Sequence, residues 1–189
     1  MVNFNKFVDF VISQHIKRMP ISYKFNILNY CINNKKNVIA EDVMFSYISN
    51  NGPKLNFKNT WPKYVRELDL ILIPNISHFK SSEEYYYILF HELSHSTMHK
   101  QRLCREVGIT NPAFEEIVAE FSTVFILLQL GISPYSHSSS FIRKNSELSL
   151  LPSVIDNIEL GSNIAISVSE YVLNSRSESQ TNTIKLEKE

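Results

Sequence analysis

Residues 81–100 of the chain read SSEEYYYILFHELSHSTMHK and contain the motif HELSH at positions 91–95. Ser81 and Glu84, three residues apart, have the spacing of a capping box, which predicts that a helix begins there. Apolar side chains then recur at helical spacing along one face of the expected helix, at Tyr86, Leu89, Phe90 and Leu93. The stretch therefore predicts a helix with a buried apolar face.

The two histidines of the motif, His91 and His95, are one helical turn apart and fall on the side opposite the apolar stripe. Two imidazole nitrogens placed in this way suit a tetrahedral ion such as Zn²⁺, although two surface histidines on an amphipathic helix are the alternative. Glu92 is rotated from His91 by about 100° around the helix axis. We expect Glu92 to lie beside the metal and to take a proton from a metal-activated water, without becoming a ligand.

The segments around this helix predict a mostly helical chain with a small β-sheet. Short strands are expected at 54–58 and 68–73, and helices before Pro20 and at 25–32, 37–48, 111–130, 141–150 and 153–173. We expect an N-terminal helical segment at 1–52, a core at 53–173 and a polar, disordered tail at 174–189.

A catalytic zinc site needs a third protein ligand and an open position for water. Glu116 and Glu120 are one turn apart on one flank of the expected helix 111–130, whereas Glu115 points to the other flank. The separation between His95 and Glu116 suits a ligand from a second helix packed against the first. We favour Glu116 as the ligand and Glu120 as the acceptor for the far nitrogen of a ligating histidine, with the exchange of these roles left open.

Other polar residues are weaker candidates. His99 is one further turn along the motif helix, too far around it to join the same ion. We expect it to line the cleft, where it is a candidate for substrate binding, and a structural histidine is the alternative. A purely structural metal site would instead need a fourth ligand such as Cys104 or His99. Tyr135 and His137 are candidate donors to an oxyanion.

The composition fits one globular domain, because 43% of the 189 residues are hydrophobic and 20% are charged. Nineteen basic and nineteen acidic residues balance, so a nucleic-acid partner stays open but is not supported by charge. Two distant cysteines predict a reduced compartment. With no signal peptide or apolar run of transmembrane length, we expect a cytoplasmic protein without a membrane partner.

Several motifs in order resemble the zincin-like metallopeptidase domain of ArdC-type antirestriction proteins. They are DLI at 69–71, Pro74, HELSHSTMHKQRL at 91–103, FEEIVAEF at 114–121 and LGI at 130–132. The resemblance covers roughly residues 40–173 and implies that His91 and His95 are metal ligands, that Glu92 is the catalytic carboxylate, and that the helix of Glu116 and Glu120 provides the remaining ligand. The arrangement is more distantly similar to that of ImmA/IrrE-type regulatory peptidases.

The chain also departs from that pattern. The signatures of the family's N-terminal single-stranded-DNA-binding domain are absent from residues 1–60, so a DNA role is not expected to come with the fold. Ser96-Thr97-Met98 stands where the family usually has Trp-Thr-Gly, and the family's tryptophan in the later helix is absent from residues 141–150. Substrate contacts are therefore expected to diverge more than the metal site.

The fold class expected from all this is α+β, a zincin-like metallopeptidase that is mostly helical with a small β-sheet beside the HExxH helix. The expected activity is that of a zinc metallopeptidase of the gluzincin type, which hydrolyses a protein or peptide substrate with a metal-activated water and Glu92 as general base. The alternative is an antirestriction or other mobile-element interaction protein that keeps the zincin fold and does not need proteolysis.

Overall fold

The computed structural model describes residues 36–105, 111–134 and 154–186, with side chains of the last helix described at 159–175. In chain order these form α3 (Val38–Ser49), β1 (Lys54–Phe57), β2 (Lys63–Val65), β3 (Leu70–Ile73), α4 (Ser82–Ser96), α6 (Pro112–Gln129) and α8 (Val154–Leu186), with single 3₁₀ turns at Arg66–Leu68 and Ile76–His78. The expected α+β class is confirmed. The helices expected within residues 1–32 and at 141–150, and the candidates Tyr135 and His137, lie outside the described residues.

Helix α4 begins where the sequence predicts. The hydroxyl of Ser81 accepts a hydrogen bond from the backbone N–H of Glu84 at 3.2 Å, and the Glu84 carboxylate accepts one from the N–H of Lys80 at 2.7 Å. The contact of Ser81 satisfies a donor that the first turn of a helix leaves without a partner, and the contact of Glu84 holds the chain just before the helix. Leu89, Phe90 and Leu93 are fully buried, which confirms the apolar face.

The three strands form one sheet in the order β1-β3-β2, with β1 parallel and β2 antiparallel to β3. The central strand β3 buries Ile71 and Ile73 completely. The sequence did not predict β2, because three residues directly after Pro62 are too short to show an alternating pattern. This strand is nevertheless the edge of the described sheet that lies against α4.

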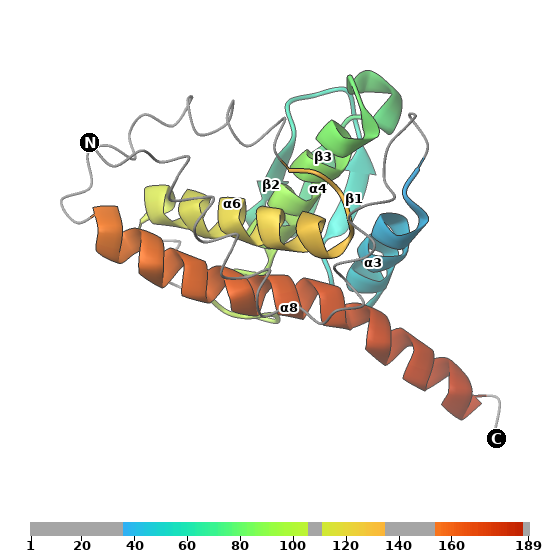
Figure 1. Cartoon of the computed structure of the whole chain (residues 1–189). Coiled ribbons are helices and arrows are strands. Elements are labelled where there is room, and N and C mark those ends of the chain that lie inside the picture. The colour runs from blue at the N-terminus through green and yellow to red at the C-terminus, as the bar shows by residue number, and fades with distance from the viewer. Residues whose placement is uncertain (1–35, 106–110, 135–153, 187–189) are drawn as a thin grey trace.

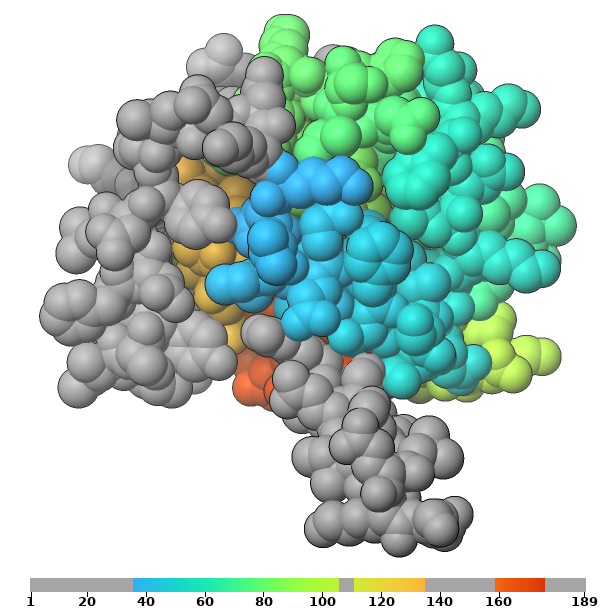
Figure 2. All heavy atoms as spheres, turned by 90° about the vertical axis from the view of Figure 1, so that its right-hand side faces the viewer, coloured from blue at the N-terminus to red at the C-terminus, as the bar shows by residue number. Residues whose placement is uncertain are grey.

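Helix α3 shares the core of α4. Its residues Val43, Met44 and Tyr47 pack in the same buried cluster as Phe90, and Figure 2 shows α3 beside the strand segment on one face of the molecule. The hydroxyls of Tyr47 and Ser96 lie 3.0 Å apart across the two helices. The helix that carries the motif therefore packs on α6 and shares buried side chains with α3, which itself packs mainly on α8.

Helix α8 packs along α6 and then continues away from the body of the protein (Figure 1). It extends to Leu186, whereas a disordered tail was expected from Asn174. Residues 174–186 contain no glycine or proline to end a helix, and their lack of apolar periodicity hid the continuation. In the described ranges, no helix has the length and apolar character that crossing a membrane requires.

Candidate metal centre

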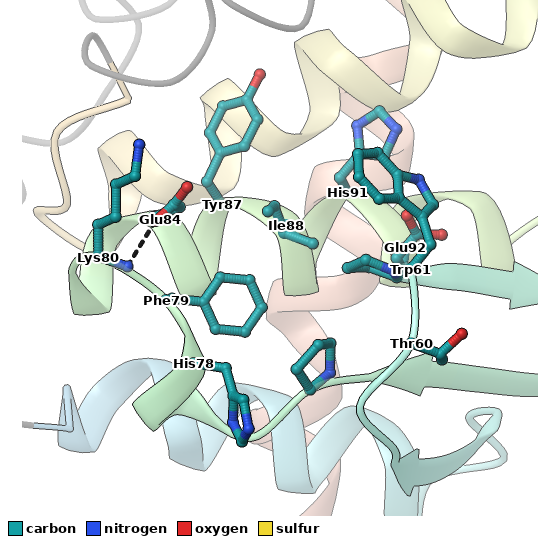
Figure 3. A pocket seen from close by; sticks show the side chains of 12 residues that line it. Thr60, Trp61, His78, Phe79, Lys80, Glu84, Tyr87, Ile88, His91 and Glu92 are labelled. Carbon is teal, nitrogen blue, oxygen red and sulfur yellow. Dashed lines mark hydrogen bonds between the residues drawn. The ribbon is translucent and has the colours of Figure 1, made fainter.

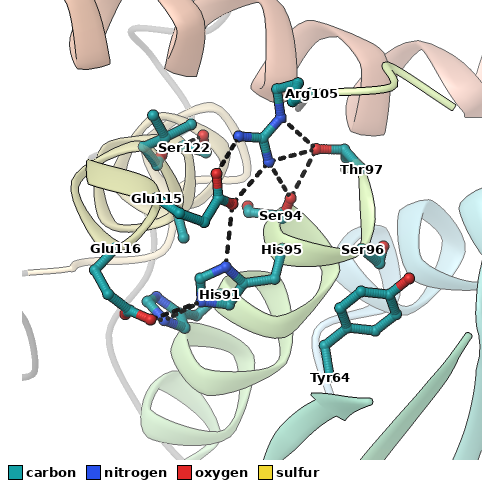
Figure 4. A network of polar contacts seen from close by, with 12 residues as sticks. Tyr64, His91, Ser94, His95, Ser96, Thr97, Arg105, Glu115, Glu116 and Ser122 are labelled. Atoms are coloured by element: carbon teal, nitrogen blue, oxygen red, sulfur yellow. Dashed lines mark hydrogen bonds and ion pairs between the residues drawn. The ribbon is translucent and has the colours of Figure 1, made fainter. Parts of the chain in front are cut away.

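Two helices bring three candidate ligands together. Nε2 of His91 and Nε2 of His95, both from α4, lie 3.1 Å apart. Glu116 of α6 faces both, with its carboxylate oxygens 3.3 Å from Nε2 of His91 and 3.4 Å from Nε2 of His95. Figure 4 shows the glutamate turned toward the two rings. One donor atom from each residue lies within 4.8 Å of the others, as one shared ion requires.

The chemistry of this group fits a metal ion. Oε2 of Glu116 is buried and is not aligned for a hydrogen bond with the imidazole beside it. Burial alone would lower the pKa of His95, but Glu115, Glu116 and the charge of Glu92 outweigh it and raise this pKa to about 10. Burial alone would raise the pKa of Glu116, but the imidazoles of His91 and His95 hold it well below its usual range. The site therefore favours a positive charge at its centre, and two nitrogens with one carboxylate oxygen suit Zn²⁺.

Glu115 supports His95 from behind, a contact that the sequence did not predict for a residue on the other flank of the apolar stripe of α6. Its Oε1 lies 3.1 Å from Nδ1 of His95. Arg105 donates to the same oxygen at 2.9 Å and also to the carbonyl of Ser94 at 3.0 Å and the hydroxyl of Thr97 at 2.9 Å. Since α6 is buried on several sides, its apolar pattern could not show which flank meets α4.

Glu120 lies behind the other histidine. Its Oε2 is 3.7 Å from Nδ1 of His91, and its Oε1 accepts a hydrogen bond from the hydroxyl of Tyr87. Burial raises the pKa of Glu120, only partly offset by His91 and Tyr87. The structure thus groups Glu116 with the two ring nitrogens that face each other and puts Glu120 at the opposite nitrogen of His91.

Glu92 is buried next to the edge of the sheet. Its Oε2 accepts a hydrogen bond from the backbone N–H of Tyr64, in β2, at 2.7 Å. The Glu92 carboxylate therefore has a fixed orientation, and the outer edge of β2 is directed toward the motif helix.

A cavity of about 500 Å³ opens beside these residues (Figure 3). His91 and Glu92 line one end of it together with Trp61, while Lys80 and Glu84 lie at the other end. The walls also include the apolar and aromatic side chains of Pro62, Pro74, Phe79, Tyr87 and Ile88. The carboxylate that is a candidate general base thus faces a largely apolar space.

His99 and Cys104 do not join the group. Helix α4 ends at Ser96, so His99 lies in the turn that follows and not on a further helical turn as expected. Neither residue is among those that line the cavity. Cys104 is exposed. Of the residues that the structure describes, only His91, His95 and Glu116 meet as candidate ligands.

A small sheet beside a helix with HExxH, and an acidic ligand candidate from a second helix, define a zincin-type metallopeptidase domain. The model of the MPTase-PolyVal family, described as a zincin-like metallopeptidase, matches residues 44–148, more than half of the chain. The chain belongs to this family of zincin-like metallopeptidases.

The fold is similar to that of antirestriction protein ArdC from the R388 plasmid. Its metal-free crystal structure has a TM-score of 0.59 and 21% sequence identity, over 79% of this chain and 54% of that chain. Its Mn(II)-bound crystal structure has a TM-score of 0.56 and 21% identity, over 78% of this chain and 56% of that chain. The chain therefore spans about half the length of these proteins. A sequence search of curated proteins gives no match. The resemblance to ArdC-type domains is confirmed.

Proposed function

We propose that the chain is a zinc-dependent peptidase in which His91, His95 and Glu116 hold the ion. The observation that carries this proposal is the meeting of three ligand atoms from two helices next to Glu92 and an open cavity. When bound, the ion supplies Lewis acidity to the scissile carbonyl and lowers the pKa of water to about 7. The Mn(II)-bound structure of ArdC supports metal binding at this fold, and sites with imidazole nitrogens generally hold Zn²⁺ more tightly than Mn²⁺.

In this proposal Glu92 acts as the general base. It takes a proton from the attacking water and later delivers it to the leaving amine. The N–H of Tyr64 holds one carboxylate oxygen of Glu92 at 2.7 Å and so limits the rotation of the side chain. The other oxygen is then the one directed to the water.

The same strand is the best candidate to bind substrate. Among the described strands, β2 pairs with β3 on one side only, and its outer edge faces the motif helix through Tyr64. An extended peptide laid along that edge would be recognised through its backbone and not its sequence, beside the N–H of Tyr64 that donates to Glu92. Its scissile bond would then pass in front of Glu92.

A second candidate function is suggested by the similarity of the fold to that of antirestriction protein ArdC. In this alternative the chain keeps the zincin site for stability or partner binding and does not hydrolyse peptides. The two functions make opposite predictions for Glu92→Gln, which removes the base while keeping the shape of the side chain.

The experiment measures the metal content of the purified full chain and its hydrolysis of a mixed peptide library. We expect about one zinc per chain, loss of the metal in His95→Ala and Glu116→Ala, and retention in Glu120→Ala. Glu92→Gln should keep the metal and lose turnover, whereas the control Glu83→Gln on the same helix should keep both. Full hydrolysis by Glu92→Gln would contradict the mechanism. An inactive wild type that retains zinc, together with a Glu92→Gln variant that still protects DNA from restriction, would support the alternative.

A further inference from the structure

The cavity beside Glu92 is lined mostly by residues that the candidate metal site does not require. Trp61 is the only tryptophan in the chain, and 74% of its surface is exposed although it lies next to the candidate base. Figure 3 shows the indole at the same end of the cavity as His91 and Glu92. An exposed aromatic ring of this size at the candidate base offers a large apolar surface to a ligand in the cavity.

The walls indicate the chemistry of that ligand. Phe79 and Ile88 lie between the two ends of the cavity, and both are partly buried, so each presents apolar surface to the space. The ring of Phe79 packs edge to face on the ring of Tyr85, with the two ring centroids 5.4 Å apart. A pre-formed aromatic wall favours a flat or bulky apolar group, because aromatic rings pack edge to face or offset against one another.

The charges of the cavity do not select an ionic group. Lys80 and Glu84 carry opposite charges at the end away from Glu92, and the other carboxylate of the lining is Glu92 itself. The carboxylate of Glu84 is already bonded to the backbone N–H of Lys80 at 2.7 Å. A volume of about 500 Å³ lies within the range of about 300–1,000 Å³ found for small-molecule sites. It accommodates one large side chain with part of the adjoining backbone.

We infer that this cavity binds a large apolar or aromatic side chain of a peptide substrate and so determines the specificity of the site. The inference rests on the proposed peptidase function, since it names the substrate class of the same site. Burial of a phenylalanine side chain is expected to strengthen binding about 10- to 100-fold relative to alanine. Trp61, Phe79 and Ile88 are the specificity residues in this assignment.

The test measures binding without metal and without turnover. The full chain is kept in a chelator and titrated with the blocked peptides acetyl-Ala-X-Ala-amide, in which X is Phe, Leu, Ala or Glu. Since Trp61 is the only tryptophan, all tryptophan emission reports on this cavity. We expect a saturable blue shift with Phe and Leu, and binding weaker by about 10-fold or more with Ala and Glu.

Variants separate the cavity from other apolar surfaces. Phe79→Ala and Ile88→Ala should each weaken the Phe peptide several-fold, whereas Phe45→Ala should not, because Phe45 is an exposed aromatic residue on α3 outside the cavity. Circular dichroism melts identify any variant that has lost its fold. If Ile88→Ala is one of them, Ile88→Val takes its place. No saturable shift with folded wild type, or equal binding of the Glu and Phe peptides, would overturn the inference.

A failure of the inference and a failure of the peptidase proposal can be told apart. Selective binding of the Phe peptide without hydrolysis of any Phe-containing peptide would support the cavity assignment and contradict the peptidase proposal. Hydrolysis by the zinc-loaded chain without preference for apolar residues would support the peptidase proposal and contradict the cavity assignment.

Discussion

Glu115 lies behind His95, with its Oε1 at 3.1 Å from Nδ1 of the imidazole, while Nε2 of the same ring faces His91 and Glu116. A carboxylate at Nδ1 keeps the proton on that nitrogen and leaves the lone pair of Nε2 for a metal ion. Arg105 fixes the carboxylate by donating to both of its oxygens. The orientation of His95 is therefore set by a contact that spans α4, α6 and the loop between them.

This support predicts that Glu115→Ala lowers the affinity for zinc about 10- to 100-fold. Glu115→Gln, which keeps an oxygen for the Nδ1 proton but no charge, should fall between Glu115→Ala and wild type. Competition with a chelating dye measures the affinity. Glu83→Ala, on the first turn of α4, is the control and should leave it unchanged. An unaltered affinity in Glu115→Ala would show that His95 is held in place without this carboxylate.

Metal binding should also stabilise the folded chain, because the three ligands come together only when α4 packs on α6. Free zinc at about 1,000 times its dissociation constant is expected to add about 4 kcal/mol to the free energy of unfolding. Thermal melts with and without a chelator measure the effect. The melting temperature of His95→Ala should not respond to zinc, and an equal response in that variant would place the ion elsewhere.

The parts of the site that the sequence predicts are those set by local geometry. His91, Glu92 and His95 take their relative positions from one helix, and the capping residues fix where that helix begins. Glu116 followed from its position on a second helix, but the contact of its neighbour Glu115 depends on the angle at which α6 crosses α4, which no periodic pattern encodes.

Arg105 and β2 were missed for a related reason. Arg105 reaches the site from the segment after α4, where spacing along a helix says nothing. Strand β2 has three residues, so its role follows from pairing with β3 and not from its own pattern. The supports of this site are long-range contacts, whereas its reactive groups are local.

A second polar link holds the edge strand. Arg102, whose side chain is fully buried, donates to both carboxylate oxygens of Asp69, and the hydroxyl of Tyr64 donates to the same carboxylate at 2.8 Å. We expect Asp69→Asn to lower the free energy of unfolding by about 2 kcal/mol, less than for a fully buried pair because Asp69 is partly exposed. Urea denaturation at pH 7 measures the loss. Glu67→Gln, a nearby exposed acidic residue, should stay within about 0.5 kcal/mol of wild type.

The same link predicts a dependence on pH. Partial burial alone would raise the pKa of Asp69, but the hydrogen bonds from Arg102 and Tyr64 and the charge of Arg102 outweigh it and hold this pKa below its usual range. A carboxylate with a depressed pKa in the folded state stabilises above its unfolded pKa of about 4, and this contribution is lost as pH falls through the folded value. The difference between wild type and Asp69→Asn should therefore be constant from pH 6 to 7 and shrink below about pH 4. Urea denaturation at several pH values checks this, and a difference that grows in acid would contradict the assignment.

The packing of α8 on α6 depends on Gly161. A Cβ at this position would lie 2.8 Å from Cγ2 of Ile117 and 3.7 Å from the ring of Phe114. Because Ile117 is branched at Cβ, its side chain has little freedom to move away. Gly161→Leu gains about 1 kcal/mol in helix propensity but forces side chains apart at a cost that exceeds it. We expect a net loss of about 1–2 kcal/mol in the free energy of unfolding.

The packing of α8 on α6 should also affect the metal site, because Ile117, which contacts α8, is next to Glu116 on α6. A leucine that pushes α6 away from α8 should shift Glu116 relative to the histidines of α4, so the zinc affinity of Gly161→Leu should fall together with its stability. Asn163→Leu introduces the same side chain at an exposed position of α8 and should change neither quantity. Chelator competition and urea denaturation of both variants provide the comparison. A stable Gly161→Leu variant with unchanged zinc affinity would show that α6 keeps its position on α4 without close contact to α8.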